Sequence, residues 1–341
     1  MWYWLTLIAG FALIAVAIAD VIWSTVSING GGPISNKVSV VCWKVSRAIF
    51  VRTSSHWFLE WTTVAILVLT FLAWVVPMWL GWTLIFSAGE EVVIHQLSEE
   101  PAGLLDRAYF AGMVYLTLGT GDLMAASEGW RMWSMVASFT GIVTITLTIS
   151  YLVSVVSAAI EKRHLASLIW VAGKSPEQVV INGWDGERFS ILDDRLYELG
   201  QRLMLHSERH LAYPVLQYFH PRDPRAALPP GLAILEDAAI ILGECVGEEA
   251  RPSSTTLRLL RQAIDLYVDR VQLEHISKVD EAPQPPELSE LREAGIPVRE
   301  PDEVPSIFEP HTERRQLLWG LVIAEGWHWP RQPCRERSRE D

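Results

Sequence analysis

Three long segments of the chain contain no charged residue, and all three lie in its first half: Met1–Ala19, Thr62–Phe86 and Met132–Ile160. A helix needs about 20 apolar residues to cross the roughly 30 Å hydrocarbon core of a bilayer. Each segment meets that length, and the third exceeds it, which allows tilting or projection beyond the membrane. The sequence therefore predicts an integral membrane protein with three spans.

The first segment admits two interpretations. It ends in Ala17-Ile18-Ala19, a small-residue pattern that resembles a signal-peptide cleavage site. No lysine or arginine precedes the apolar run, however, and signal peptides carry positive charge there. We favour a retained helix and keep cleavage as the alternative.

Charges in the loops predict the orientation. Between Ser27 and His56 all charges are positive, namely Lys37, Lys44, Arg47 and Arg52, and Lys162 and Arg163 follow the third span. The loop between the second and third spans is mainly acidic. Because basic loops stay in the cytoplasm, we expect a multi-pass protein of the cell membrane. Its N-terminus lies outside, and everything after the third span lies in the cytoplasm.

The acidic loop contains LLDRAYFAGMVYL at 104–116 and TLGTGD at 117–122. At 1.5 Å per residue, a helix over 104–116 covers only about 20 Å and cannot span. Since the flanking spans run in opposite directions, this helix must enter and leave on the outer side. Non-helical backbone at membrane depth is tolerated only where protein buries it or where it lines a water-filled path. A cation can take the place of water at its carbonyls.

Two other interpretations of TLGTGD are a polar outer loop and a phosphate-cradling turn. A phosphate loop needs a following lysine or helix N-terminus, and the next residues, LMAASEG, contain no basic side chain. The position between a short apolar helix and a span favours an ion path.

The order span, short helix, T-x-G-x-G-D, span resembles the pore domain of the potassium channel superfamily over residues 57–163, roughly a third of the chain. In that family four such loops surround one axis, and their backbone carbonyls replace the hydration shell of the ion. The resemblance implies a selectivity filter formed by Thr117, Leu118, Gly119, Thr120, Gly121 and Asp122. It also implies a homotetramer, and Gly141 matches the family's hinge glycine.

The two filter glycines fit this resemblance physically. Alternating backbone handedness is needed to point successive carbonyls at one axis, and glycine tolerates positive φ. Thr120 departs from the family, which usually has an aromatic residue there that braces the filter. We expect Tyr109 and Phe110 of the pore helix to supply that bracing. Because of Thr120, cation conduction is a firmer prediction than potassium selectivity.

The remainder of the chain reads as a helical, acidic domain. Beyond His164 it contains 20 basic and 30 acidic residues, which excludes a nucleic-acid surface. A capped helix is expected from Ser175, amphipathic helices over 190–219 and 254–277, and a last helix over 312–327. His206 and His210 lie on one face of a helix. Such a pair is more often part of an ordinary helix face than of a metal site or a pH sensor. No nucleophile, triad or carboxylate pair predicts an enzyme.

The expected fold is mainly α, with three spans and one re-entrant pore helix joined to a mostly helical soluble domain. The expected parts are an N-terminal transmembrane helix (1–27), a basic cytoplasmic loop (28–56), the pore domain (57–163, with its inner span at 130–160), a helical cytoplasmic domain (164–279), a Pro-rich linker (280–311) and a C-terminal helix and tail (312–341).

These features predict a tetrameric cation channel, potassium-selective and gated at the inner helix. It would need no cofactor, with K⁺ only as permeant ion. Its expected partners are the other subunits, the lipid bilayer, monovalent cations and an unidentified cytoplasmic ligand. The alternatives are a non-selective monovalent cation channel, because of Thr120, and a non-conducting membrane sensor or scaffold.

Overall fold

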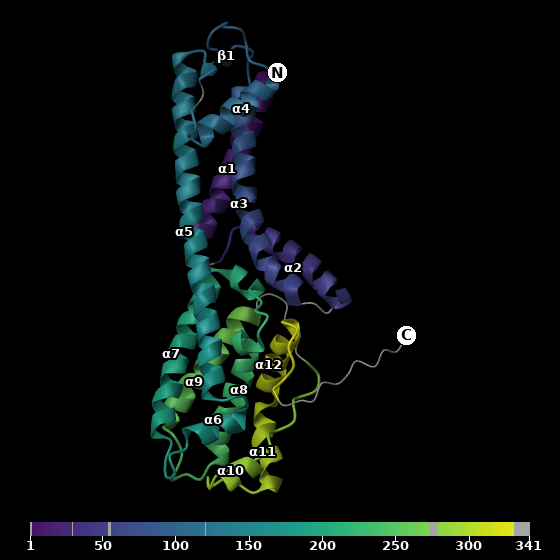
Figure 1. Cartoon of the computed structure of the whole chain (residues 1–341), viewed down its shortest axis with the longest axis vertical. Coiled ribbons are helices and arrows are strands. Elements are labelled where there is room, and N and C mark those ends of the chain that lie inside the picture. The colour runs from purple at the N-terminus through teal and green to yellow at the C-terminus, as the bar shows by residue number, and fades with distance from the viewer. Residues whose placement is uncertain (1, 29, 54–55, 120, 273–278, 331–341) are drawn as a thin grey trace. The chain divides into compact units, whose positions relative to one another are not determined.

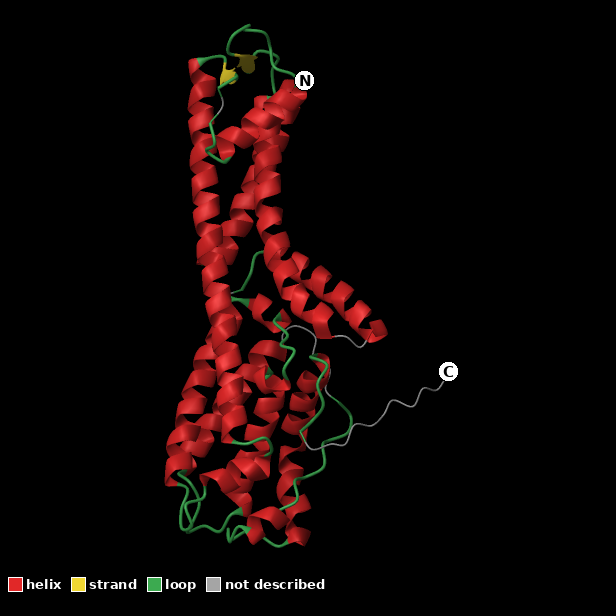
Figure 2. Cartoon of the chain, in the orientation of Figure 1, coloured by secondary structure: helices red, strands yellow, loops and turns green. Residues whose placement is uncertain are grey.

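The computed structural model describes residues 2–28, 30–53, 56–119, 121–272 and 279–330. The chain divides into two compact units. The first, here called the membrane unit, comprises Met1–Val156 and Ala212–Tyr218; the second, here called the C-terminal unit, comprises Ser157–Leu211 and Phe219–Asp341. Helices dominate both units, and helix α5 contributes to each (Figures 1 and 2). The expected mainly α class is confirmed.

The membrane unit contains five helices and one short strand pair among its described residues. They are α1 (Trp2–Val26), α2 (Pro33–Thr53), α3 (His56–Phe86), β1 (Val93–His95), α4 (Leu104–Tyr115), β2 (Leu123–Ala125) and the first part of α5 (Glu128–Ala172), with the 3₁₀ turn η1 (Pro214–Tyr218). Of the described helices, α1, α3 and α5 are long and apolar enough to cross a membrane. The three predicted spans are therefore present, and α5 continues beyond the expected end at 160.

Two glycines bring α1 and α3 close together. A Cβ atom added to Gly10 would lie 2.7 Å from the carbonyl oxygen of Gly81, and one added to Gly81 would lie 2.8 Å from that of Gly10. Small residues allow such close approach between membrane helices, where no hydrophobic force drives helices together. The first helix is thus packed directly against the outer helix of the predicted pore domain.

The segment 28–56, predicted as a loop, is largely the helix α2, so that prediction is wrong. The helix begins at Pro33, which suits a first helical position. The carboxylate of Asp20 in α1 accepts hydrogen bonds from the amides of Ile34 (2.7 Å) and Ser35 (3.2 Å) and from Trp74 Nε1 (2.8 Å). A buried acid is satisfied here because it caps another helix, and the same contact joins α1, α2 and α3.

A segment from the second half of the chain completes the membrane unit. After α7 (Ser190–Ala212), the turn η1 packs on α2 and α3. Tyr218 stacks near Trp43 at a centroid distance of 5.6 Å, and its carbonyl accepts a hydrogen bond from Thr63 Oγ1 (3.3 Å). The amphipathic helix expected over 190–219 therefore ends at Ala212, because residues 212–218 belong to the membrane unit.

The C-terminal unit surrounds one buried helix, α8. Every residue of α8 (Leu228–Ile240) is buried, and α6 (Pro176–Gly183), α9 (Ser254–Gln272) and α12 (Thr312–Ala324) pack on it. The unit also contains the end of α5, nearly all of α7, and the shorter elements η2 (Pro224–Ala226), the π-helix η3 (Ile241–Cys245), α10 (Ser289–Glu293), η4 (Pro301–Glu303), α11 (Val304–Phe308) and η5 (Glu309–His311). The expected cap of α6 is confirmed, since Ser175 Oγ accepts from the amide of Gln178 at 3.2 Å.

Acids on α8 are paired with arginines inside this unit. Asp237 accepts two hydrogen bonds from Arg315, at 2.8 and 3.1 Å, and both residues are almost fully buried. Glu236 is paired with Arg261 (3.3 Å) and Arg314 (3.2 Å). Buried charges are tolerated only when paired in this way, so α9 and α12 are held to α8 by charge as well as by apolar contact.

The segment 280–311, predicted as a Pro-rich linker, is packed into the same core. Leu288, Leu291, Ile296 and Phe308 are all buried in it, and the carbonyls of Pro283 and Gln284 accept hydrogen bonds from Arg315. The linker prediction is wrong because the prolines shape short turns between apolar residues that reach the core. A further difference concerns the unit boundary, which lies at Ser157 inside α5 instead of at 164.

Candidate functional site

Helix α4 occupies the place predicted for the pore helix, ending one residue before the expected 116. Its 12 residues cover about 18 Å, too short to span. The start of the helix is fixed by Arg107, whose Nε donates to the carbonyl of Ala102 and whose Nη2 donates to that of Glu90, both at 2.8 Å. These bonds hold the entry of α4 against the outer loop.

Indole groups of α3 hold α4 and α5. Trp79 Nε1 donates to the carbonyl of Ala108 in α4 (2.9 Å), and Trp82 Nε1 donates to Thr140 Oγ1 in α5 (3.0 Å). A Cβ atom on Gly112 would lie 3.1 Å from Trp79 Nε1, so glycine makes room for that indole. Neither contact could be predicted from the sequence, because tryptophans are equally expected in the interfacial belt.

The end of α4 forms a Schellman motif. The amide of Leu118 bonds to the carbonyl of Met113 (2.8 Å), and that of Thr117 bonds to that of Val114 (3.1 Å). The motif places its C′ residue in the left-handed region, where glycine is usual, yet Thr117 lies there with φ of 57°. A β-branched residue in this conformation is strained by roughly 1–2 kcal/mol. Strain of this kind gathers at functional sites.

Helix α5 touches the same end of α4. Ser138 Oγ donates to the carbonyl of Val114 at 2.9 Å. A Cβ atom added to Gly141 would lie only 1.7 Å from the carbonyl oxygen of Tyr115. The residue predicted as a gate hinge is thus also the point where the pore helix reaches α5, and α5 continues as a helix through it.

The described residues of the predicted filter are exposed in the single chain. Thr117, Leu118, Gly119, Gly121 and Asp122 all lie open to solvent, and Thr120 lies outside the described residues. Two described residues of this segment adopt the left-handed region, and one of them is Gly119, with φ of 79°, as the alternating backbone requires. Thr117 supplies the other left-handed position.

The outer end of this segment is fixed by the strand pair. The carbonyl of Asp122 accepts a hydrogen bond from the amide of Gln96 (2.9 Å), and β2 then pairs antiparallel with β1. Phe110 packs edge-to-face on Phe86 in α3 (5.2 Å), and Tyr109 is half exposed. In the chain itself, Gln96 and the β1–β2 pair hold the end of this segment at Asp122, and the bracing by Tyr109 and Phe110 stays a prediction.

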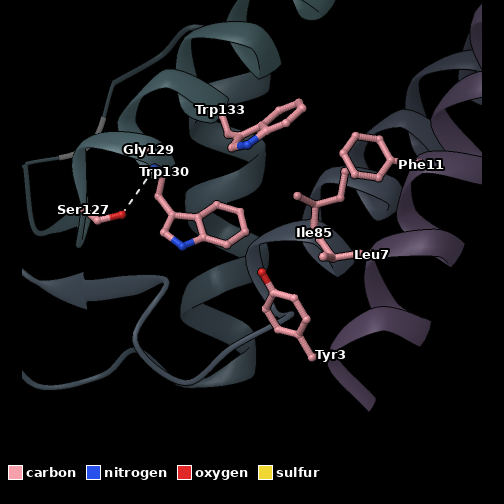
Figure 3. A pocket seen from close by; sticks show the side chains of 8 residues that line it. All are labelled: Tyr3, Leu7, Phe11, Ile85, Ser127, Gly129, Trp130 and Trp133. Atoms are coloured by element: carbon pink, nitrogen blue, oxygen red, sulfur yellow. Dashed lines mark hydrogen bonds between the residues drawn. The ribbon is translucent and has the colours of Figure 1, made fainter. Parts of the chain in front are cut away.

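A separate cavity of about 250 Å³ lies at the outer end of the membrane unit. Figure 3 shows Tyr3, Leu7 and Phe11 of α1 facing Trp130 and Trp133 near the start of α5. None of its eight lining residues is charged. None of the residues 117–122 lines this cavity, so it is separate from the predicted filter.

The two candidate histidines are buried in the C-terminal unit. His206 and His210 are 2% and 4% exposed and lie beside Tyr267. Burial, together with the charge of Lys162, lowers the pKa of each to about 3, so both are neutral at physiological pH. No group of three metal-ligating side chains occurs among the described residues. The ordinary structural interpretation of this helix face therefore fits best.

A short helix and a strained, exposed loop lie between two helices that are long and apolar enough to span a membrane. A family model described as "Ion channel" matches residues 61–158, which include the short helix and the loop. Residues 61–158 are therefore a pore domain of this ion channel family, with two spans as in the potassium channel superfamily.

The similarity to one membrane protein extends over nearly the whole chain. The chain is 31% identical over 327 residues to a protein of Bacillus subtilis (strain 168) named "Uncharacterized membrane protein YdjJ", covering 96% of this chain and 95% of that one. Both units thus lie within the shared region. No solved structure matches the chain.

Proposed function

We propose that four copies of the chain form a channel that conducts potassium ions down their gradient. The carbonyls of residues 117–121 line the path, with Thr117 at the inner end and Asp122 at the outer mouth. No cofactor takes part, and the only ligands of the path are monovalent cations and water. Catalytic chemistry has no role in this proposal.

The proposal rests on one contrast: both ends of the 117–122 loop are held in place, while the described residues between them are exposed. The loop is tied at its inner end by the Schellman motif and Ser138, and at its outer end by Gln96. Between these ties its described residues remain exposed. One such loop cannot surround an ion. Four loops around one axis can, and their backbone carbonyls then coordinate the ion in place of water. This favours the homotetramer.

The charge pattern supports the orientation with the N-terminus outside and the C-terminal unit in the cytoplasm. We further propose that α5 opens the pore by bending near Gly141, and that the C-terminal unit biases this step.

Thr120 favours a second candidate, a channel that conducts sodium and potassium alike. Threonine is too small to brace the filter at the width that a tyrosine or phenylalanine would set. We expect Thr120→Tyr to shift ion preference further towards potassium. An unchanged preference would count against the bracing role.

The test is the reversal potential of the purified protein in liposomes with potassium on one side and sodium on the other. A value near the potassium equilibrium potential supports the selective channel. Current with a reversal potential near zero supports the non-selective one. No current from a folded tetramer, verified by native mass spectrometry, would mean a non-conducting membrane sensor or scaffold.

A further inference from the structure

The C-terminal unit contains a solvent-facing cavity of about 440 Å³ between α8, α9 and α12. These helices contact one another in the order α9, α8, α12 and lie together in Figure 1. Ligand cavities typically have volumes of 300–1,000 Å³. One face of α9 forms a wall of the cavity with residues spaced three or four apart, namely Ser254, Arg258, Arg261 and Asp265. The cavity lies entirely within this unit.

Four arginines line this cavity, although the surrounding domain is acidic: Arg251, Arg258, Arg261 and Arg314. Arg261 and Arg314 are both held by the buried carboxylate of Glu236, at 3.3 and 3.2 Å. Asp265 is paired with Arg314 as well. These two arginines are therefore neutralised and fixed in place, and they frame the cavity without offering a free positive charge.

The other two arginines have no carboxylate partner among the described residues. Arg251 donates only to backbone carbonyls, from Nε to Val246 (2.8 Å) and from Nη2 to Glu244 (3.5 Å). Arg258 is exposed and makes no hydrogen bond or ion pair within the part of the chain that the structure describes. Two guanidinium groups that retain their charge thus border one cavity.

The remaining acid of the lining, Glu244, is occupied by its neighbours. Its Oε1 lies 2.7 Å from His311 Nε2, while His311 Nδ1 lies 2.8 Å from Arg261 Nη2. Because the guanidinium can only donate, Nδ1 accepts, and the neutral ring then donates its Nε2 proton to Glu244. Arg261 Nη1 also lies 3.7 Å from Glu244 Oε1, so the partners of this carboxylate are His311 of η5 and Arg261 of α9, and not Arg258.

The cavity also contains a local departure from regular helix geometry. The π-helix η3, which follows α8, brings Gly243 and Glu244 into the lining. Single π turns are frequent at functional sites. Apolar lining from Ala239, Pro252 and Leu257 adds room for an uncharged part of a ligand. The backbone amide of Ser253 is already bound to Asp193 (3.1 Å), so recognition falls to the guanidinium groups and not to the start of α9.

We propose that this cavity binds a small phosphorylated anion through Arg251 and Arg258. Planar guanidinium groups match phosphate oxygens with paired, charge-assisted hydrogen bonds. The bound anion contacts both the turn that follows η3 and helix α9. Its binding is the signal to which the C-terminal unit responds. That regulatory role rests on the proposed channel function, whereas the binding site itself does not.

The test uses pyrophosphate as the probe and the full-length protein in detergent, without divalent cations. Isothermal calorimetry compares the wild type with Arg258→Gln, which breaks no described contact, and with Arg195→Gln, an exposed arginine on α7 outside the cavity. We expect wild type and Arg195→Gln to bind alike, and Arg258→Gln to bind about tenfold or more weakly, as loss of a hydrogen bond to a charged group predicts.

Absence of pyrophosphate binding to the wild type at millimolar concentration would overturn the proposal. So would equal binding by Arg258→Gln and Arg195→Gln, since that result means non-specific attraction of anions. Flux from liposomes is then measured with and without pyrophosphate. Binding that leaves flux unchanged would refute the regulatory role alone, and flux in the absence of binding would leave the channel proposal standing without this site.

Discussion

Apart from Arg107 at the start of α4, neutral donors hold the helices around the predicted filter segment in the membrane unit, whereas buried ion pairs hold the interior of the C-terminal unit. Around α4 the ties are indoles and a hydroxyl, from Trp79, Trp82 and Ser138. Around α8 they are guanidinium–carboxylate pairs, with Arg315 on Asp237 and two further arginines on Glu236. Each set of contacts fixes helices against one another.

The difference follows from the two solvents. A charge inside a bilayer is costly, so a membrane helix is positioned by neutral hydrogen bonds worth about 1 kcal/mol each. In a soluble core a paired charge is tolerated, but removing one partner strands the other at a cost of about 3–5 kcal/mol. We therefore expect substitutions in the C-terminal unit to act mainly on stability, and substitutions beside α4 mainly on conduction.

The largest expected effect is that of Arg315→Met. It leaves Asp237 buried without its guanidinium and frees the carbonyls of Pro283 and Gln284. We expect a loss of about 3–5 kcal/mol in the free energy of unfolding, measured by denaturant titration with circular dichroism.

The matched control is Arg202→Met, which removes an exposed pair with Glu198 and should cost less than about 1 kcal/mol. Combining Arg315→Met with Asp237→Leu should recover much of the loss. Equal losses for Arg315→Met and Arg202→Met would mean that the buried pair has no special weight.

Gly141→Ala tests the contact between α4 and α5. Its methyl group would meet the carbonyl of Tyr115, so the end of the pore helix must shift. We expect a loss of about 1–3 kcal/mol in stability, as for other overpacked cores, and loss of conduction in liposomes.

Gly129→Ala, on the same helix, is the control for Gly141→Ala, because its added methyl group meets nothing closer than 4.0 Å. Alanine is also the better helix former. If Gly141→Ala conducts normally and only its opening kinetics change, the glycine serves as a hinge and not as a packing contact.

The buried histidines predict sensitivity of the C-terminal unit to acid. The pKa of His206 and of His210 is lowered from 6.5 to about 3 in the folded chain. Unfolding therefore takes up protons below pH 6.5, and the stability is complete above 6.5 and lost as the pH falls towards 3. Between pH 7 and pH 5 we expect a loss on the order of 2 kcal/mol for each histidine.

His206→Phe should reduce that pH dependence while keeping the stack on Tyr267, which has a centroid distance of 5.8 Å. His328→Phe, at an exposed position, should leave it unchanged. Unfolding midpoints at the two pH values decide the matter. If the stability of His206→Phe falls between the two pH values as much as that of the wild type, His206 is not a source of the acid sensitivity.

The spans and α4 could be predicted because each has a local signature. Uncharged runs mark the spans, and the short apolar stretch before TLGTGD marks the pore helix to within one residue. Besides the short α10 and α11 of the predicted linker, two longer helices were not expected. The helix α2 depends on Asp20 and Ser24 in the preceding helix for its start. The helix α8 is buried on every side, so it has no amphipathic period, and two prolines in its first turn resemble a loop.

The details of the candidate site could be predicted from the sequence only in part, for the same reason. TLGTGD indicated where the backbone would be exposed, and Gly119 adopts the expected positive φ. The supports come from residues distant in sequence, such as Gln96 and Ser138, which no local pattern distinguishes from other loop or span residues. The left-handed conformation of Thr117 was equally hidden, because a threonine gives no signal for it.

The smallest stability change is expected for Thr117→Gly, which separates strain from function most directly. Glycine adopts the C′ position of a Schellman motif without penalty, so the variant should be more stable by about 1 kcal/mol. It also removes the hydroxyl that we place at the inner end of the ion path. We therefore expect a higher unfolding midpoint together with reduced potassium flux. Thr117→Ser, which keeps the hydroxyl and loses the β-branch, should conduct as the wild type does. If Thr117→Gly conducts normally, the threonine side chain contributes nothing to permeation and its strained backbone reflects only the way α4 ends.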